Sequence, residues 1–521
     1  MWIKLKQHRL LIAVVFLAAA LRLVALNQVP ASLDWDEVAI GWNAKTIWHT
    51  RRDEYGTLLP LSFKSFGDFK APAYIYLTAP VVGLLGMNAF SVRLLSALAG
   101  SFSVALIYFI AQELFKKNPV TRNSKLVALI SALLLAVTPW HLLMSRPAFE
   151  PNLALFFILA GTWLFLKGTR KGKFLLLSAV FFAAAFYSYH SPKIFLPPFL
   201  LGLGLIFRHQ LFNRKIKTWS IVATILGLLL LMPLAKDLLT SQSGARFQGT
   251  SIFYTGEGES KPLSFSLVGE MAKNYLVHFS PGFLFSGGDD IPRVQMEKVG
   301  PLLIIQAPFL LWGLWQVFGQ RRKTWAKVLL LWLFVGPLPA AIGFEAPHPI
   351  RAFQLLPVLT IVTALGLVQV KKVKLEILAA LALLVNAAFF SYRYFTAYPV
   401  YSAPDFQYGY REAVTLAETY EDQVDKIIIT SFYQQPHVFT YFYQQRDPQA
   451  VFWGAMSKYL FRAINWDSDR QGIIEDGRQL TSILLVGSPA EIPAAAPGLV
   501  ATVNFPDGQP AFRLAKIAPK P

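Results

Sequence analysis

The sequence has no cysteine among its 521 residues and carries little charge for its length. Without cysteine it can form no disulfide, no thiolate metal site and no cysteine nucleophile. Asp, Glu, Lys and Arg make up 15% of the residues, whereas 54% are hydrophobic and the mean hydropathy is +0.44. A soluble globular chain has about 25% charged residues, so this composition indicates a polytopic membrane protein.

Acidic residues are the scarcer charged group, with 30 Asp and Glu against 49 Lys and Arg and a net charge of +19. A strongly basic chain can bind nucleic acid, but these basic residues cluster in short loops between apolar runs, where orientation in the bilayer explains them. We therefore expect no nucleic-acid partner. The basic loops, which the positive-inside rule places in the cytoplasm, lie near residues 4–9, 116–125, 167–173, 208–217, 321–327 and 371–374.

The other loops hold nearly all the acidic residues, so we predict that they face outside. They include a first loop, 27–89, a long loop, 236–299, and everything after about 395. This sorting predicts a cytoplasmic N-terminus, an external C-terminus and an odd number of spans. We expect about eleven spans, at 9–26, 90–113, 126–143, 151–167, 174–189, 194–208, 218–235, 301–318, 327–343, 352–370 and 375–394.

Two apolar stretches need separate interpretation. Residues 10–26 follow three basic residues as in a signal sequence, but no convincing small-residue cleavage site follows, so we interpret them as an uncleaved first helix. Residues 72–86 contain two prolines and two glycines. They are also too few for a membrane span, which needs roughly 20 residues. If they crossed the membrane, every later basic loop would lie outside, so we predict an interfacial or re-entrant helix there.

The composition changes near residue 395, where the last predicted span ends. Short apolar runs at 425–430 and 482–487 predict buried strands, and the patterns at 408–422 and 435–445 predict helices. Residues 500–514, which turn at Pro506-Asp507-Gly508, are typical of a hairpin. We predict a transmembrane module over 1–394 and a small external α/β domain over 395–521. No internal repeat is evident, which weakens a repeat-based transporter fold.

Three carboxylates, Asp34, Asp36 and Glu37, lie close together in the first external loop. The apolar spacing after them, with its tryptophans, predicts a helix along the membrane surface. An aspartate at this position can cap the helix by accepting its first free backbone N–H groups. It can also act as a general base for a lipid-borne substrate, because carboxylates at this depth are costly and often functional. Both interpretations can hold together.

Basic residues also occur on the predicted external side, against the topology bias. Lys70 lies among aromatic and apolar residues, where it either extends its ammonium to the interface or binds phosphate. Arginine forks pair bidentately with phosphate and lysine supplies a point charge, so a pocket for a lipid phosphate would use several such residues. The other cations at predicted outer helix ends are Arg93, Arg146, Lys193, Arg246, Arg293 and Arg351.

Further candidates are His190 and His348, each near a basic residue at an outer helix end, where a histidine is either structural or contacts substrate. The 236–299 loop, which contains Arg246, is long enough to cover a site. Its Asp289-Asp290 pair either forms a turn or binds a divalent cation with other loops. We expect no obligatory metal or other cofactor. No glycine-rich loop leads from a strand into a helix, so a nucleotide-sugar donor is not expected.

The order of these elements resembles that of the type C glycosyltransferases, specifically the protein O-mannosyltransferase and aminoarabinose transferase relatives that use a polyprenyl-phosphate sugar. The resemblance covers residues 1–200 well and the remainder mainly through topology. It rests on Asp36-Glu37, on Lys70-Ala71-Pro72, on Arg93, and on Ser145-Arg146-Pro147-Ala148-Phe149-Glu150. The chain departs from the family pattern by having one proline after the lysine, and a glutamate where the second acid is usually aspartate.

The resemblance implies a membrane glycosyltransferase that moves a hexose or pentose from a polyprenyl phosphate to a hydroxyl of a protein, lipid or glycan outside the plasma membrane of a prokaryote. Asp36 would be the base of an inverting displacement, Glu37 would position the acceptor or sugar, and Glu150 would be the second acid. The donor phosphate would be bound by Lys70, Arg93, Arg146, Lys193 and Arg351, with His190, Arg246 and His348 as further substrate contacts.

Two other classes of protein remain open at this point. A polytopic transporter or lipid flippase would carry charges within its spans, whereas most spans here have no central ionisable residue and the unusual charges lie on one side. A receptor or assembly scaffold would act through its external domain.

Overall fold

The computed structural model describes residues 2–517 except 117–123, 241–248, 256–258, 263, 288–290, 371, 476–477 and 481. The chain forms two compact units. Unit 1 comprises Met1–Val24, Leu61–Tyr74 and Leu95–Tyr394, and unit 2 comprises Ala25–Pro60, Ile75–Leu94 and Phe395–Pro521. Two parts of the predicted first external loop thus group with the C-terminal segment.

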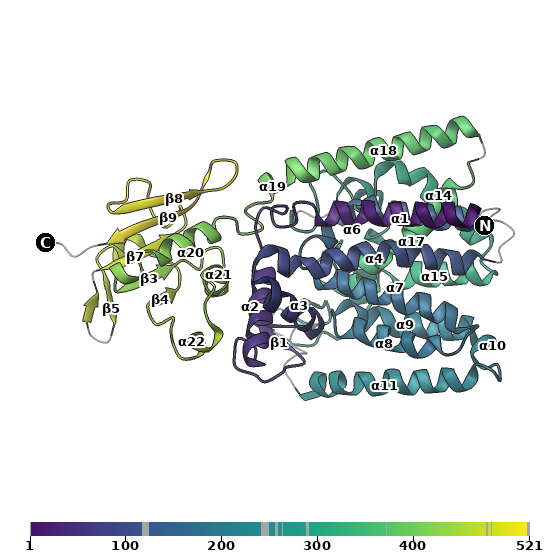
Figure 1. Ribbon diagram of the computed structural model, residues 1–521, viewed down its shortest axis with the longest axis horizontal. Coiled ribbons are helices and arrows are strands. Elements are labelled where there is room, and N and C mark those ends of the chain that lie inside the picture. The colour runs from purple at the N-terminus through teal and green to yellow at the C-terminus, as the bar shows by residue number, and fades with distance from the viewer. Residues whose placement is uncertain are drawn as a thin grey trace. The chain divides into compact units, whose positions relative to one another are not determined.

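Unit 1 consists mainly of helices that run side by side (Figure 1). Its core contains the fully buried Trp140 and Trp332. The elements are α1 (Trp2–Leu23), β1 (Phe63–Ser65), β2 (Asp68–Lys70), α4 (Ala89–Phe115, which begins in unit 2), α5 (Ser124–Val137), α6 (Pro139–Ser145), α7 (Glu150–Gly168), α8 (Phe174–Phe186), α9 (Ser191–Ile206), α10 (Arg208–Leu211), α11 (Lys217–Thr240), α13 (Phe265–Val277), η2 (Gly282–Ser286), η3 (Ile304–Gln306), α14 (Ala307–Gly319), α15 (Thr324–Val335), α16 (Leu338–Ala341), η4 (Phe353–Leu355), α17 (Leu356–Leu367) and α18 (Val373–Thr396).

Every range predicted as a span coincides with a helix or with two consecutive helices. The chain is a helical polytopic membrane protein. Among the described residues, five helices are long and apolar enough to cross a membrane, or six if the bent pair α5–α6 counts as one span. Several other apolar helices are shorter than these. A span needs roughly 20 residues, so the number of about eleven spans stays a prediction.

The predicted span 126–143 is bent by 58° between α5 and α6. The break falls at Thr138, which precedes Pro139 at the first position of α6. Proline has no N–H to continue the hydrogen bonds of α5, and its ring disfavours a helical conformation in the residue before it. The bend starts a new short helix whose C-cap is Arg146, one of the predicted site residues.

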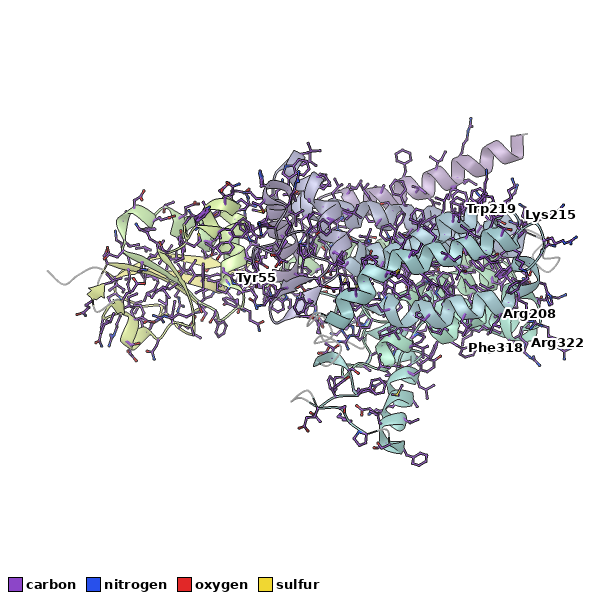
Figure 2. The ribbon with its side chains drawn as sticks, turned by 90° about the horizontal axis from the view of Figure 1, so that it is seen from below. Tyr55, Arg208, Lys215, Trp219, Phe318 and Arg322 are labelled. Carbon is purple, nitrogen blue, oxygen red and sulfur yellow. The ribbon has the colours of Figure 1, made fainter. Side chains whose placement is uncertain are left out.

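Basic residues from separate loops gather at one end of the unit 1 helices. Figure 2 shows Arg208, Lys215 and Arg322 there, with the aromatic residues Trp219 and Phe318 beside them. Membrane proteins commonly have Lys and Arg in their cytoplasmic loops and aromatic residues at the membrane interface, which matches this arrangement. It supports the prediction that these loops lie on one side of the membrane.

Residues 72–86 form the predicted helix, α3 (Pro72–Leu85), which has 14 residues. With a rise of about 1.5 Å per residue, a helix of this length extends about 21 Å, whereas the hydrocarbon core of a bilayer is about 30 Å thick. The helix is therefore too short to span a bilayer as an upright segment. Its interfacial or re-entrant placement remains a prediction.

The C-terminal part of unit 2 confirms the predicted mixture of helices and strands. Strands β4, β3 and β7 are parallel, and β9 and β8 continue the sheet in antiparallel fashion, in the order β4-β3-β7-β9-β8. The predicted hairpin is the β8–β9 pair. The elements are α19 (Tyr398–Tyr401), α20 (Tyr410–Glu418), η5 (Glu421–Gln423), β3 (Lys426–Ile429), α21 (Pro436–Tyr443), α22 (Pro448–Phe452), β4 (Tyr459–Phe461), α23 (Trp466–Asp469), β5 (Ile473–Glu475), β6 (Arg478–Leu480), β7 (Ile483–Gly487), β8 (Leu499–Asn504) and β9 (Pro510–Ile517).

Within unit 2, the first-loop helix α2 (Trp35–Thr50) packs on α21. The ring of Trp42 lies 5.2 Å from that of Tyr441. Gly41 permits this close approach, because a Cβ there would come within 2.4 Å of Phe442 Cε2. The Lys45 ammonium donates to the carbonyls that follow α21, at 2.8 and 2.9 Å. These contacts hold the helix that carries the predicted catalytic carboxylates.

Candidate functional site

The neighbouring carboxylates Asp34, Asp36 and Glu37 differ in their surroundings. Asp34 is the N-cap of α2, and its Oδ1 accepts from Glu37 N at 2.8 Å. Glu37 completes a capping box by accepting from Asp34 N at 3.3 Å. Such reciprocal bonds satisfy backbone donors that a helix start leaves free. The prediction of a capping aspartate is confirmed for Asp34. Asp36, in the first turn, has no part in this box and is half-buried.

Glu37 also forms a buried ion pair with Arg93, and both side chains are fully inaccessible to solvent. Arg93 Nε and Nη2 lie 2.8 and 2.9 Å from the two carboxylate oxygens. Its Nη1 donates to Leu26 O and Pro30 O at 3.0 Å each, and Nη2 also donates to Ser32 O. All five guanidinium N–H donors are thereby used.

Through these contacts Arg93 and Glu37 together stabilise the local structure around the start of α2. The arginine joins the loop before α2 to the start of α4 and holds the first turn of α2 through the Glu37 carboxylate. A bidentate fork is stronger and more directional than a single neutral hydrogen bond. Phosphate binding by Arg93 and substrate contact by Glu37 stay predictions, and each would need this network to open.

In unit 1, the structure brings three of the predicted residues near one another. Lys70 ends strand β2 and is 7% exposed. The carbonyl of its neighbour Phe69 lies 3.0 Å from His190 Nε2, and His190 Nδ1 lies 3.3 Å from Lys193 Nζ. A lysine ammonium donates, so these contacts together require a neutral imidazole with its proton on Nε2. A histidine thus connects the segments that carry two predicted phosphate ligands.

Arg146 is fully buried at the end of α6. Its Nη1 and Nη2 donate to Leu21 O and Val24 O, at 2.7 and 2.9 Å, and its guanidinium lies 5.7 Å from the Tyr394 ring centroid. A cation at the last carbonyls of a helix is favourable because those carbonyls have no partner within the helix. This contact gives Arg146 a role in fixing the C-terminal end of α1, besides its predicted role with the donor.

Arg351 and His348 occupy a second cluster in unit 1, together with His278 from the long loop. His278 Nδ1 donates to Asn274 O at 2.7 Å, and its Nε2 accepts from His348 N at 3.0 Å. The Glu345 carboxylate lies 3.5 Å from His348 Nε2 and 3.9 Å from Arg351 Nη2. The predicted covering role of the 236–299 loop stays a prediction, but its residue His278 contacts this cluster directly.

The Arg351 guanidinium has an unusual environment. Its Nη1 is buried without a hydrogen-bond partner in the described part of the chain. Gly343 leaves the room for this atom, because a Cβ there would lie 2.0 Å from it. The same loop is tied to α6, since Trp140 Nε1 donates to Pro349 O at 3.1 Å. A buried donor without a partner is costly, which points to a ligand.

The remaining predicted residues belong to neither of these clusters as far as the described contacts show. Glu150 begins α7, where a carboxylate interacts favourably with the helix N-terminus. Arg293 is half-buried in the long loop. Arg246 and the Asp289-Asp290 pair lie outside the described residues.

Sequence reasoning missed Arg22, which is fully buried in α1. Its Nη1 donates to Ala18 O and Ala136 O, and its Nη2 lies 2.6 Å from His141 Nδ1. Gly100 leaves space for it, because a Cβ there would lie 3.0 Å from Arg22 Nε. The available signal was an arginine inside an apolar span, which is costly in a membrane and marks a functional or structural site.

The stability of the protein is expected to fall at low pH through His278. Burial lowers its pKa to about 4, partly offset by its hydrogen bond to Asn274 O. In the unfolded chain the pKa of His278 is near 6.5, so as the pH falls the unfolded chain binds the proton before the folded protein does. The contribution of neutral His278 to the free energy of unfolding is therefore complete above about pH 6.5 and is lost as the pH falls toward 4. The free energy of unfolding is expected to fall by up to about 1.4 kcal/mol per pH unit between these two pH values.

Thermal unfolding of the purified protein at pH 7.5, 6.0 and 4.5 measures this effect. The difference in Tm between wild type and His278→Gln should narrow as the pH falls. His437, whose pKa burial also lowers to about 4, is present in both proteins and cancels in the comparison. A difference in Tm that is constant with pH would contradict the prediction.

The helices of unit 1 and the mixed sheet of unit 2 have a fold similar to that of solved structures of ArnT. The apo structure of ArnT from Cupriavidus metallidurans superposes with a TM-score of 0.58 at 11% identity, covering 98% of this chain and 99% of that one. The structure of ArnT from the same organism bound to undecaprenyl phosphate gives a TM-score of 0.55 at 12% identity, covering 96% and 97%. At these identities the similarity shows the fold.

Sequence comparison finds similarity to one family over part of the chain. Residues 69–235 match the family described as dolichyl-phosphate-mannose-protein mannosyltransferase. A Bacillus subtilis (strain 168) protein named "Putative mannosyltransferase YkcB" is 31% identical in an alignment 196 residues long, which covers 35% of this chain and 26% of that protein. The match thus spans about a quarter of the length of this curated relative. The resemblance predicted from the sequence is confirmed by both kinds of comparison.

Proposed function

We propose that the protein is an integral membrane glycosyltransferase that transfers a hexose or pentose from a polyprenyl phosphate to a hydroxyl of a protein, lipid or glycan on the external face. The family match over residues 69–235 supports the lipid-phosphate donor. So does the similar fold of ArnT, one structure of which holds undecaprenyl phosphate. The proposed location is the plasma membrane of a prokaryote, with a cytoplasmic N-terminus and an external C-terminal domain.

The proposed reaction is a single displacement. The acceptor oxygen attacks the anomeric carbon, the bond from that carbon to the phosphate oxygen breaks, and polyprenyl phosphate leaves with the bonding electrons. Asp36 takes the proton of the attacking hydroxyl, and attack from the face opposite the phosphate inverts the anomeric centre. A positioned base of this kind contributes ~10²–10⁴-fold to the rate. Glu37, paired with Arg93, positions the turn that carries Asp36.

Cations of unit 1 stabilise the leaving phosphate in this proposal. The observation that carries this assignment is the buried Arg351 Nη1 without a hydrogen-bond partner among the described residues. A phosphate oxygen would satisfy that donor in a charge-assisted bond. Lys70 and Lys193, whose segments are connected through His190, supply further positive charge. Preorganised charges of this kind act where charge develops in the transition state.

The test uses the full-length protein in lipid nanodiscs with defined polyprenyl-phosphate sugars and a membrane extract as acceptor. Mass spectrometry should detect free polyprenyl phosphate together with a new glycosidic product. The proposal fails if no hexosyl or pentosyl donor is consumed. It also fails if liposome assays show that a substrate crosses the membrane without any glycosidic bond being formed, which would indicate a transporter or flippase.

Gly343→Ala is expected to weaken donor binding. Its Cβ would lie 2.0 Å from Arg351 Nη1 and 3.2 Å from Cζ, so the guanidinium must move. Loss of a charged hydrogen bond of about 1.5–3 kcal/mol corresponds to a roughly 10–100-fold higher donor KM. Steady-state kinetics with varied donor concentration measure this change.

Arg351→Met should raise the donor KM similarly, and the double variant should be no worse than Arg351→Met alone. Gly319→Ala is the matched control, because a Cβ there meets no atom within 4 Å. If Gly343→Ala and Arg351→Met had independent, additive effects, the glycine would not act through the arginine.

A further inference from the structure

Unit 2 contains a pocket of about 590 Å³ that none of the roles proposed above uses. Its walls come from the loop before α2, between residues 27 and 33, and from the turn at 87–90. The start of α20, the end of α21 and Pro506 of the β8–β9 turn complete it. The volume lies in the range of about 300–1,000 Å³ that is usual for small-molecule sites.

Five of the polar side chains that line this pocket are available to a ligand. Four are exposed and Tyr408 is half-buried. In the described part of the chain, none of the five side chains has a hydrogen-bond or ion-pair partner. Together they offer amide, hydroxyl, guanidinium and carboxylate groups, and so both donors and acceptors. The five are Asn27, Gln28, Tyr408, Arg411 and Glu412.

The pocket has no excess of either charge. Arg411 and Glu412 carry opposite charges and face the same pocket. Burial raises the pKa of Tyr408, as does the charge of Glu412, so its hydroxyl stays neutral at physiological pH. An anionic lipid phosphate would be expected to select an excess of Lys and Arg. This pocket is therefore suited to an uncharged ligand.

An apolar surface accompanies these polar groups. Phe90 lines the pocket and leaves 39% of its side chain exposed. A sugar ring presents neighbouring hydroxyls, each a donor and an acceptor, around apolar C–H faces. Planar amide, guanidinium and carboxylate groups match pairs of hydroxyls, and an aromatic ring covers a C–H face. The combination corresponds to the chemistry of a neutral carbohydrate.

The same pocket wall is bonded to the Glu37–Arg93 pair. The backbone carbonyl of Ser32, which lines the pocket, accepts from Arg93 Nη2. Two residues after Ser32 comes Asp34, the cap of α2. A ligand in this pocket would therefore contact the chain segment that fixes the helix of the proposed base.

We propose that this pocket is a subsite for a neutral carbohydrate and that it holds the glycan part of the acceptor. The acceptor role rests on the proposed glycosyltransferase function, whereas carbohydrate binding does not. Asn27, Gln28 and Arg411 bind pairs of hydroxyls, and Phe90 covers a ring face. The acceptor class is thereby narrowed from any hydroxyl compound to a glycan or glycolipid.

The experiment measures binding to full-length protein in nanodiscs without donor, by isothermal titration calorimetry and saturation-transfer NMR. The probes are neutral tetrasaccharides of glucose, mannose and N-acetylglucosamine, and an anionic glycerol phosphate hexamer. At least one neutral probe should bind saturably and more tightly than the anionic one. Arg411→Ala and Tyr408→Phe should each weaken that binding about tenfold, as expected for a loss of about 1.4 kcal/mol.

Arg470→Ala, which removes a half-exposed arginine of unit 2 outside the pocket, is the matched control and should bind as wild type does. The proposal is overturned if no neutral probe binds, if the anionic probe binds more tightly, or if the pocket variants bind as wild type does. Donor consumption in the same preparation separates the two proposals. Donor turnover without glycan binding refutes the subsite alone, and glycan binding without donor turnover refutes the transferase function alone.

Discussion

Asp36→Asn should lower the rate of sugar transfer by about 10²–10⁴-fold, the contribution of a positioned general base. Asparagine keeps the size of the side chain but cannot accept the proton of the acceptor hydroxyl. Asp36 has no part in the capping box that Asp34 and Glu37 form, so its replacement should leave the start of α2 intact. The rate of polyprenyl phosphate release and the rate of product formation, both measured by mass spectrometry, give the loss.

Three comparisons make this test specific. The variant should retain the wild-type Tm and the wild-type affinity for the donor, since the substitution removes neither the cap nor a cation. Asp467→Asn, at an exposed aspartate of unit 2, is the matched control and should transfer sugar normally. Asp34→Ala should lower the Tm, because it removes the N-cap of α2. It should lower the rate much less than Asp36→Asn does, because it leaves the base in place. Full activity of Asp36→Asn would refute the assignment of Asp36 as the base.

Breaking the Arg93–Glu37 pair is expected to destabilise the protein by about 3–5 kcal/mol, because removal of one partner leaves a buried charge without compensation. Arg93→Met removes all five N–H donors of the guanidinium, including those that hold the carbonyls of Leu26, Pro30 and Ser32. Glu37→Gln removes the opposite charge while preserving the volume. Chemical unfolding in detergent micelles, followed by tryptophan fluorescence, measures the free energy of unfolding.

A double-mutant cycle measures the interaction energy between Arg93 and Glu37 separately from their interactions with other residues. Arg93→Met with Glu37→Gln should be less destabilised than the sum of the two single variants, because no unpaired charge is left. Arg93→Lys keeps the charge but cannot form the fork or reach all of its acceptors, so it should lie close to Arg93→Met. Arg470→Ala, at a half-exposed arginine, should change the stability by less than about 1 kcal/mol. Single variants as stable as wild type would refute a structural task for the pair.

The positions of the helices could be predicted from local sequence, because an apolar run long enough to cross a bilayer has few alternatives to a helix. All the predicted spans fall on helices. The strands β3 and β7 and the β8–β9 hairpin were likewise predicted from short β-rich runs and a Pro-Asp-Gly turn. The capping role of Asp34 was one of two predicted alternatives, since a cap depends on the backbone within a few residues.

The partners of the site residues could not be predicted in this way. Glu37 pairs with Arg93, 56 positions further along the chain, and nothing in either local segment specifies the other. Arg351 owes its space to Gly343, and His278 of the long loop bonds to the backbone of His348. These pairings depend on which helices pack together, and packing is decided by the fit of many side chains at once.

Composition and charge were therefore sufficient to predict a polytopic membrane protein and the sorting of its loops. The family resemblance rested on short motifs, and the resemblance together with the positions of the charges indicated the candidate residues, because each of these depends on short-range pattern. Tertiary structure was needed to group Ala25–Pro60 and Ile75–Leu94 with the C-terminal segment, and to distinguish a capping Asp34, a paired Glu37 and a half-buried Asp36. The physical reason is that burial and hydrogen-bond partners, which decide what a charged group can do, arise from contacts between segments far apart in the chain.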